Sequence, residues 1–266
     1  MRIATVNANG LRAALRKGGA EWLDAIPADI IALQEVRAPE ALVREALEPA
    51  WAVVHDESEI AGRAGAALLV RGEARDPIVR LPGLSPVPAH TGRWAEATVA
   101  TPHGDVRAVS VYVHSGQAGT PKMDDKYAFL DAMTARMGEL LASHERVVVM
   151  GDINIAHTPR DLKNWKGNLK TAGFLAEERA YLDAWLAQGW VDVHRALSGE
   201  VDGPYTWWSQ RGKAFDNDVG WRLDYQFASP QLAALASDAR VDRAATWDSR
   251  WSDHAPLIVR YSPLTS

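Results

Sequence analysis

The sequence contains no cysteine, which excludes disulfide bonds, thiolate metal sites and a cysteine nucleophile. It also lacks an apolar run of the roughly 20 residues that a membrane-spanning helix needs. Met1 leads directly into the strand-like run Arg2–Val6 rather than into a charged and then apolar leader. We therefore expect a soluble, cytoplasmic protein that does not engage a membrane.

An excess of positive charge is absent as well. The 34 acidic and 29 basic residues give a net charge of −5, whereas nucleic-acid-binding domains are usually basic. Basic residues do cluster within 160–170, and others stand at Lys122, Lys126, Arg211 and Lys213. Charge alone favours a solvated surface for these residues over a nucleic-acid-binding face.

The rest of the composition is that of a globular protein, with 47% hydrophobic and 24% charged residues. The 11 tryptophans are unusual, and we expect some of them to line a binding site as well as the core. No Gly-, Ser- or Pro-rich linker divides the chain, so we predict a single domain over residues 1–266.

Short runs rich in Val, Ile and Ala predict strands along the whole chain, with helices between some of them. Strands are expected at 2–6, 30–33, 51–55, 66–70, 94–100, 106–112, 147–150, 190–193, 204–208, 223–228, 240–243 and 257–261. Helices are expected at 39–47, 124–143 and 177–188. This mixture predicts an α/β protein, and comparable sets of strands in the two halves of the chain would fit two stacked sheets.

One pair of candidate polar residues follows the apolar run Val147–Met150. After Gly151, the side chains of Asp152 and Asn154 stand at positions i and i+2, on the same side of an extended chain. Such a pair can bind a metal ion or orient a water molecule. It is equally typical of an ordinary strand-to-loop turn, because Asp, Asn and Gly all favour turns.

A second pair, Asp253 and His254, immediately precedes the last predicted strand. Aspartate can hold a hard cation, and histidine can donate a proton or stabilise a developing oxyanion. Taken alone, an Asp–His pair is more often structural.

Other polar residues also follow predicted strands: Asn7 and Asn9 after the first, Glu35 after 30–33, and Tyr112 at the end of 106–112. Individually, an Asn-Gly turn, a surface glutamate and a core aromatic are the better interpretations. If the last strand is antiparallel to the others, however, these groups converge with Asp152, Asp253 and His254 on one sheet edge, where open sheets place their sites.

The combined chemistry is informative. Oxygen ligands with one histidine and no cysteine suit Mg²⁺ or Mn²⁺ better than zinc. The chain has no serine-centred nucleophile elbow and no Gly-rich phosphate loop before a lysine. We therefore predict metal-assisted attack of water on a phosphodiester.

Five motifs resemble the exonuclease III family of abasic-site endonucleases, within the endonuclease–exonuclease–phosphatase superfamily. They are Asn7-x-Asn9-Gly10-Leu11-Arg12, Leu33-Gln34-Glu35, Gly151-Asp152-x-Asn154-Ile155-Ala156-His157, Gly220-Trp221-Arg222-Leu223-Asp224-Tyr225 and Ser252-Asp253-His254-Ala255-Pro256. The segments Asp161–Asn168 and Gly173–Arg179 are similar to those of its DNA-repair branch.

The resemblance implies a DNase I-like four-layer α/β sandwich, in which two mixed sheets are flanked by helices. It also implies that Glu35 binds Mg²⁺ or Mn²⁺ with Asp253 and Asn9 near it, although some members carry Asp in place of Asn9. Tyr112 would contact the phosphate or serve as a proton source.

The same resemblance assigns catalytic roles. Asp152 would be the general base or water-orienting carboxylate, assisted by Asn154 and Asn7. His254 would stabilise the transition state and would be held by Asp224.

Substrate choice would rest on an apolar pocket for a flipped, base-free sugar, formed by Trp207, Trp221 and Leu223. A normal base is too large for a tight apolar slot, and an abasic nucleotide loses little stacking when it swings out. Arg211 falls near a wedge position, while the loop 114–122 lacks the arginine that mammalian-type members insert into DNA.

The basic segment is then expected to grip DNA phosphates, through residues that include Asn164, Lys166 and Asn168. The predicted function is that of a monomeric DNA-repair hydrolase, a Mg²⁺-dependent endonuclease that cuts 5′ to abasic sites. It would also have 3′–5′ exodeoxyribonuclease and 3′-phosphodiesterase activity on double-stranded DNA with blocked 3′ ends.

Two alternatives remain. One is a superfamily phosphodiesterase with another substrate, which would not be expected to carry the abasic pocket. The other is a catalytically inactive nucleic-acid-binding relative, which should have lost some of the catalytic residues, and all of them are present here.

Overall fold

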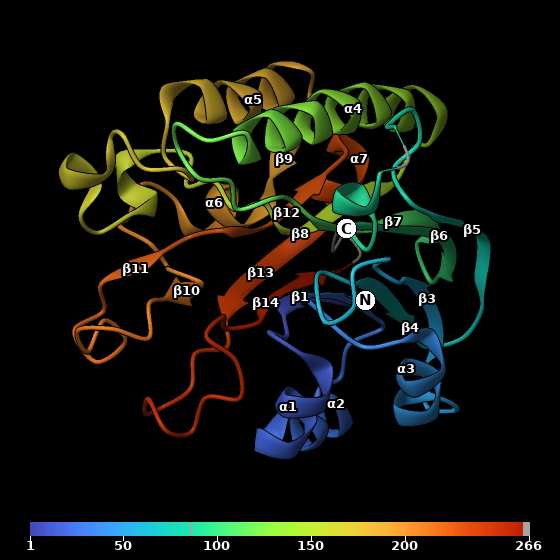
Figure 1. The fold of residues 1–266 in the computed structure, drawn as a ribbon. Coiled ribbons are helices and arrows are strands. Elements are labelled where there is room, and N and C mark those ends of the chain that lie inside the picture. The colour runs from blue at the N-terminus through green and yellow to red at the C-terminus, as the bar shows by residue number, and fades with distance from the viewer. Residues whose placement is uncertain (86, 263–266) are drawn as a thin grey trace.

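The computed structural model describes residues 1–85 and 87–262. Two six-stranded sheets pack face to face, and helices cover their outer faces, so that the chain forms four layers (Figure 1). The predicted four-layer α/β sandwich is therefore confirmed. Within the described residues, no helix is long and apolar enough to cross a membrane.

The first sheet combines strands from both ends of the chain. Its order is β13 (Ala236–Val241), β14 (Leu257–Tyr261), β1 (Arg2–Asn7), β2 (Ile30–Gln34), β4 (Ala66–Val70) and β3 (Ala52–Asp56). β1 is parallel to β2 and antiparallel to β14. The two sheets therefore do not divide into N-terminal and C-terminal halves, because the last strand pairs with the first.

The second sheet is built from the middle of the chain. Its order is β5 (Ala74–Val79), β6 (Trp94–Thr101), β7 (Gly104–Tyr112), β8 (Val147–Asp152), β12 (Asp224–Ala228) and β9 (Val191–Asp192). β7 and β8 are parallel, and β12 is antiparallel to β8. A separate two-stranded ribbon pairs β10 (Trp207–Trp208) with β11 (Gly220–Trp221).

Helices complete the outer layers. The first sheet is covered by α1 (Leu11–Ala14), the π-helical turn η1 (Leu15–Gly19), α2 (Ala20–Ala25) and α3 (Glu40–Leu47). The second sheet is covered by α4 (Lys122–Ser143) and α5 (Ala176–Ala187), seen at the top of Figure 1. The smaller elements are η2 (Pro88–His90), η3 (Pro159–Asp161), η4 (Trp165–Asn168), α6 (Val193–Ser198) and α7 (Pro230–Ala233).

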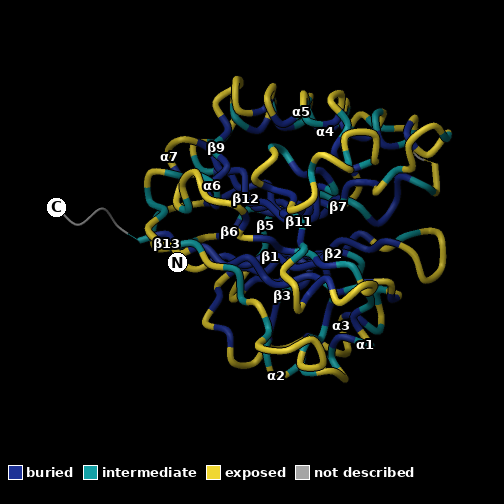
Figure 2. The backbone as a smooth tube through the Cα atoms, turned by 90° about the vertical axis from the view of Figure 1, so that its left-hand side faces the viewer, coloured by how far each residue is buried: buried dark blue, intermediate teal, exposed yellow. Residues whose placement is uncertain are grey.

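The core has three apolar layers that match this architecture. One lies between the sheets and includes Ile3, Val70 and Val148. The other two lie between each sheet and its helices, and Trp185 belongs to the layer under α5. Because both faces of the central strands are covered, the strands read as nearly continuous apolar runs. Figure 2 shows them buried inside a more exposed outer shell.

Several sequence predictions need correction. The strand predicted at 190–193 is limited to Val191–Asp192, because the chain enters α6 at Val193. The strand predicted at 204–208 is limited to β10. The edge strand β5 was not predicted, since it carries Asp76 and Pro77 and buries little apolar surface. The helical region 11–25 was also not predicted.

Gly151 allows β8 to run close beside β7. Its φ is +150°, and a Cβ added there would lie 1.9 Å from the carbonyl oxygen of Val111. No larger residue fits without separating the two strands. The glycine thus keeps Tyr112 and Asp152 paired in register at the strand ends.

Candidate active site

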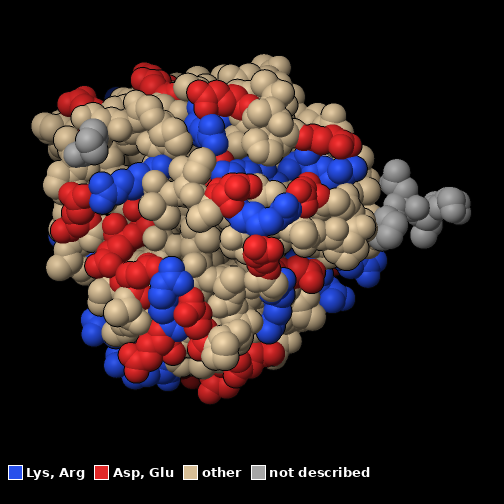
Figure 3. Space-filling view, turned by 90° about the vertical axis from the view of Figure 1, so that its right-hand side faces the viewer, with Lys and Arg blue, Asp and Glu red and all other residues tan. Residues whose placement is uncertain are grey.

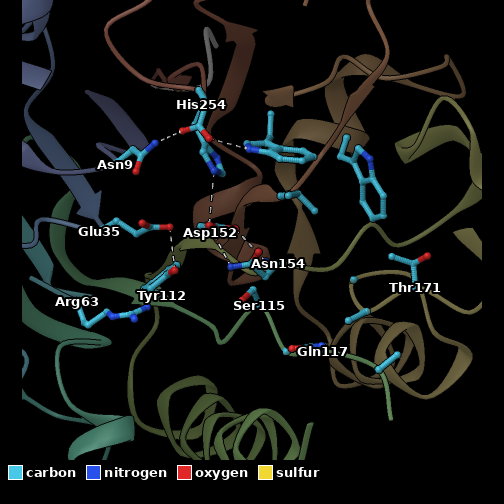
Figure 4. A pocket seen from close by; sticks show the side chains of 18 of the residues that line it. Asn9, Glu35, Arg63, Tyr112, Ser115, Gln117, Asp152, Asn154, Thr171 and His254 are labelled. Atoms are coloured by element: carbon cyan, nitrogen blue, oxygen red, sulfur yellow. Dashed lines mark hydrogen bonds and ion pairs between the residues drawn. The ribbon is translucent and has the colours of Figure 1, made fainter. Parts of the chain in front are cut away.

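A cavity of about 800 Å³ opens where β1, β2, β7 and β8 end. Asn9, Glu35, Tyr112, Asp152, Asn154 and His254 all point toward it (Figure 4). The predicted convergence is therefore confirmed, but the predicted single sheet edge is wrong. Glu35 and His254 come from the ends of the first sheet, and Tyr112 and Asp152 from the second, because the stacked sheets bring these ends together.

Asn7 connects the two sheets within the site. Its side-chain amide nitrogen, Nδ2, donates one hydrogen bond to Glu35 Oε1 and one to Asp152 Oδ2, both at 2.9 Å. Asn7 is fully buried, and the hydroxyl group of Ser252 donates to its backbone carbonyl at 2.6 Å. This side chain therefore fixes the spacing between a first-sheet and a second-sheet carboxylate.

Asp152 is 1% exposed and is surrounded by donors. Besides Asn7, the backbone N–H of Asn154 donates to Oδ1 at 3.0 Å, and the Asn154 side chain donates to Oδ2 at 3.2 Å. Burial raises the pKa of Asp152 to about 7, although the positive charge of His254 acts in the opposite direction. The carboxylate can therefore exchange a proton near neutral pH.

His254 is held by Asp224, as the sequence resemblance implied. Its Nδ1 lies 2.8 Å from Asp224 Oδ2, and its Nε2 lies 3.8 Å from Asp152 Oδ2. Burial alone would lower the pKa of His254, but the charges of Asp224 and Asp152 raise it to about 10. The imidazole is thus a cation at neutral pH, directed into the cavity.

Glu35 lies at the left of the cavity in Figure 4 and adopts a left-handed backbone conformation, with φ of +49°. Its Oε1 accepts a hydrogen bond from the Tyr112 hydroxyl at 2.8 Å, and its Oε2 pairs with Arg37. Burial and the charge of Glu35 raise the pKa of Tyr112 well above its usual value. Tyr112 is therefore a neutral hydrogen-bond donor at physiological pH.

Asp253 lines the same cavity. Its Oδ1 accepts from the Asn9 amide at 2.8 Å, and its Oδ2 accepts from the Trp207 indole at 3.2 Å. Glu35 and Asp253 are both only partly buried, in contrast to Asp152. Two accessible carboxylates beside an amide form an all-oxygen donor set, and such a set fits a hard divalent cation.

A second group of potential ligands lies deeper. One atom each from Asp152, Asp224 and His254 all lie within 4.8 Å of one another. Asp224 Oδ1 is buried and has no hydrogen-bond partner among the described residues. This trio could hold a divalent metal ion only if His254 lost its proton, because an imidazolium offers no lone pair.

An aromatic wall forms the other side of the cavity. Trp207 and Trp221 meet edge to face, with ring centroids 6.3 Å apart, and Leu223 lines the cavity with them. β10 and β11 position the two indoles, and Leu162 forms an isolated bridge with Trp221. Other tryptophans, such as Trp94 and Trp185, are buried in the core.

Four predicted DNA-contacting residues do not line this cavity: Asn164, Lys166, Asn168 and Arg211. The first three lie on or beside η4, on the loops at the left of Figure 1, and Arg211 lies on the exposed loop after β10. Conversely, the cavity is lined by Arg37, Arg63 and residues 171–173, which carried no assigned role, and by Lys170 from the segment expected to grip DNA phosphates. Lys170 was visible in the sequence only as part of the basic segment.

Acidic and basic residues are intermixed on the side of the molecule shown in Figure 3.

Within the basic segment, Arg160 pairs with the exposed Glu200 at 3.2 Å. Asp161 instead points inward, where its Oδ1 meets Arg222 Nε at 2.7 Å and Arg195 Nη2 at 2.5 Å. Burial alone would raise the pKa of Asp161, but the two guanidinium groups hold it well below its usual range.

Replacing Asp161 with asparagine is therefore expected to lower the free energy of unfolding by up to about 3–5 kcal/mol, because the buried Arg222 then keeps only Asp192 as a charged partner. Urea denaturation measures the change. The matched control is Glu200→Gln, which removes the partner of an exposed pair whose glutamate is 89% accessible. That variant should stay within about 1 kcal/mol of wild type. Equal effects of the two substitutions would contradict a structural role for Asp161.

Comparisons with known proteins agree with this geometry. Residues 4–254 match the model of the Endonuclease/Exonuclease/phosphatase family. An exodeoxyribonuclease of Bacillus subtilis is 32% identical over 259 residues, covering 97% of this chain and 98% of the relative.

Two solved structures share the fold over nearly the whole chain. The 3′-5′ exonuclease NExo of Neisseria meningitidis superposes with a TM-score of 0.88 at 29% identity, covering 98% of this chain and 100% of that one. An AP endonuclease of Archaeoglobus fulgidus gives 0.84 at 26% identity, covering 98% and 99%. The chain therefore belongs to the endonuclease/exonuclease/phosphatase family and is a phosphodiester hydrolase.

Proposed function

We propose that this protein is a DNA-repair hydrolase that cuts the phosphodiester bond 5′ to abasic sites and trims blocked 3′ ends of double-stranded DNA. The observation that carries the proposal is the placement of the Asp152 and His254 groups opposite an aromatic wall in one cavity. The first provides the chemistry, and the second provides a site for a nucleotide without its base.

In this proposal Asp152 accepts the proton of an attacking water molecule. Its carboxylate, at the end of β8, accepts three hydrogen bonds: one from the Asn7 side chain, one from the Asn154 side chain and one from the Asn154 backbone N–H. These bonds prevent the carboxylate from rotating during the reaction. The protonated His254 faces the phosphate and stabilises the negative charge that develops on it. Asp224 keeps the imidazole charged and oriented.

Glu35 and Asp253, with Asn9 beside them, would hold a Mg²⁺ or Mn²⁺ ion. When bound, the ion neutralises phosphate charge and polarises a phosphoryl oxygen. Tyr112 is placed to donate a hydrogen bond to the phosphate, since its hydroxyl group already meets Glu35 at the cavity wall. The buried trio of Asp152, Asp224 and His254 is a weaker candidate because of the charge on the imidazole.

Trp207, Trp221 and Leu223 would select the substrate by size. The apolar wall that these side chains form in the cavity would admit a bare sugar and exclude a sugar with its base, and the flipped abasic nucleotide has little stacking to lose. Cations beyond the cavity, including Lys166 and Arg211, would contact the flanking phosphates. Action as a monomer, in the cytoplasm and through one domain, stays a prediction from the sequence.

The test is incision of a labelled duplex that carries one abasic analogue, compared with the same duplex carrying a normal nucleotide. We expect incision with Mg²⁺ or Mn²⁺ and none after chelation. Absence of metal-dependent incision would reject the proposed substrate. Hydrolysis of the normal duplex at an equal rate would point instead to a general phosphodiesterase.

Trp221→Ala is expected to reduce the preference for the abasic duplex over the normal duplex by about 10- to 100-fold. The smaller side chain widens the apolar pocket, where discrimination by size is typically worth about 1–3 kcal/mol. The ratio of the two kcat/KM values measures this preference. Trp247→Ala is the matched control, because Trp247 is 47% exposed and lies outside the cavity lining. An unchanged ratio in Trp221→Ala would remove Trp221 from the selective wall.

A further inference from the structure

A buried ion pair lies directly behind the cavity. Lys126, in the second turn of α4, and Glu178, in the first turn of α5, are both fully buried, with Nζ and Oε1 2.5 Å apart. Burying two charges is costly, and a pair of this kind is weak evidence of a contribution to stability. Its other contacts indicate a different role.

Lys126 uses its remaining donors on two active-site loops. Its Nζ donates to the backbone carbonyl of Asn154 at 3.0 Å and to that of Ser115 at 3.2 Å. Ser115 and Asn154 both line the cavity, one after β7 and the other after β8. The ammonium group therefore has three partners, and two of them are the backbones that carry cavity residues.

Glu178 holds a third loop. Its Oε2 accepts from the backbone N–H of Gly173 at 2.6 Å and from that of Leu175 at 2.9 Å. Gly173 lines the cavity and packs closely, since a Cβ added to it would lie 3.2 Å from the Asn154 carbonyl oxygen and 3.3 Å from the Trp221 ring. One buried pair thus connects the loop beside Trp221 to the loop of Asn154.

Asn154 is the residue on which these contacts converge. It has a left-handed backbone conformation, with φ of +54°, a conformation that asparagine adopts more readily than most other residues with a side chain. Its side chain donates to Asp152 and to the Val113 carbonyl oxygen. Lys126 holds the backbone carbonyl of the same residue, so a shift of Lys126 would be transmitted to the hydrogen bonds of Asp152.

Lys126 and Glu178 are too deeply buried to touch DNA. We propose that they form a positioning unit, in which the buried pair fixes Asn154 against Asp152 and the 171–175 loop against Trp221, and so sets the turnover rate. This inference rests on the proposed function for its assay. Failure of this inference can be told apart from failure of the proposed function. The inference concerns the difference in kcat between variants, whereas the proposed function concerns incision by the wild-type protein.

The test separates stability from positioning by replacing the pair with apolar side chains, in the double variant Lys126→Met with Glu178→Leu. A well-packed apolar replacement of a buried ion pair is often neutral for stability or better. It cannot hold the Ser115 and Asn154 carbonyls or the Gly173 N–H. We expect a thermal midpoint near that of wild type, and kcat for abasic-site incision lower by about 10- to 100-fold, the scale of an ångström-level misplacement.

The KM for the abasic duplex should change less than about threefold, because the pair touches no substrate. The concentration of binding-competent protein, measured by titration with the duplex, corrects kcat for any unfolded fraction. The control is the triple variant Glu96→Leu, Arg107→Met and Arg136→Met, which removes a buried carboxylate of β6 together with both guanidinium groups that pair with it, away from the cavity. Its corrected kcat should equal that of wild type.

A corrected kcat of the Lys126/Glu178 variant equal to that of wild type would overturn the inference while leaving the proposed function intact. Wild-type protein that does not incise would reject the proposed function itself. If the double variant does not fold, Glu178→Gln serves instead, because it keeps an acceptor for Gly173 but removes the charge that holds Lys126. At least a threefold loss of corrected kcat is then expected, and no loss would overturn the inference.

Discussion

Asp152→Asn is expected to lower kcat for abasic-site incision by about 10²–10⁴, the range for removal of a general base. Asparagine has nearly the same shape, and its single carbonyl oxygen in the Oδ2 position can still accept from the side chains of Asn7 and Asn154. It loses the bond from the Asn154 backbone N–H to Oδ1 and cannot take up a proton. Affinity for the abasic duplex should therefore be retained. Incision and binding are measured on the same labelled duplex, the latter in the presence of a chelator.

The same substitution should stabilise the metal-free protein at alkaline pH. Burial raises the pKa of Asp152 from its usual value of 3.8 to about 7. Between these two pH values the native state binds the proton and the unfolded state does not, so the free energy of unfolding falls as pH rises through this window. A neutral asparagine does not have this cost. Thermal midpoints at pH 5 and pH 8.5 should differ less in the variant than in wild type, and Asp183→Asn, at an exposed carboxylate, is the control.

A kcat of Asp152→Asn equal to that of wild type would contradict the role of Asp152 as the general base.

Asp224→Asn is expected to move the alkaline limit of activity to lower pH by at least one unit. The charges of Asp224 and Asp152, acting against burial, raise the pKa of His254 to about 10, so the imidazolium persists below that pH and is lost above it. Removing the charge of Asp224 lowers the pKa of His254. The effect should be large, because Asp224 is the closer of the two carboxylates, at 2.8 Å. For each unit by which the pKa of His254 falls below the assay pH, the protonated fraction and therefore the rate should fall about tenfold.

The pH dependence of kcat between pH 6 and pH 10.5 measures this effect for wild type and Asp224→Asn. Asn154→Ala provides a comparison, because it lowers the rate through Asp152 without removing a charge next to His254. Its alkaline limit should coincide with that of wild type. If all three profiles share one alkaline limit, the charged His254 is not the group that fails at high pH.

The predictability of the fold from sequence depended on burial. Strands covered on both faces, such as 66–70 and 257–261, were found because nearly all their residues are apolar. The edge strand β5 was not found, because exposure on one side allows Asp76 and Pro77 within it. The boundary at Val193 was misplaced because strand and helix share one apolar run, and periodicity cannot divide it.

The candidate site followed the same pattern. Strand ends could be read from the sequence, so Asn7, Glu35, Tyr112 and Asp152 were recognised as candidates by position alone. Individually each was an ordinary turn, surface or core residue. Their chemistry became specific only when they were considered together, and the roles of Asp224, Trp207 and Trp221 came from the family resemblance rather than from spacing.

By itself the sequence determined the class of fold, the family and half of the residues that line the cavity, because these depend on local apolar patterning and on motifs that are contiguous in the chain. Only the tertiary structure decided how those side chains interact. It showed that the site joins two sheets rather than one edge, that Asp161 is part of a buried ion-pair network, and that Lys126 and Glu178 lie together behind Asn154. Such contacts arise from the packing of segments distant in sequence, and no local pattern of residues records them.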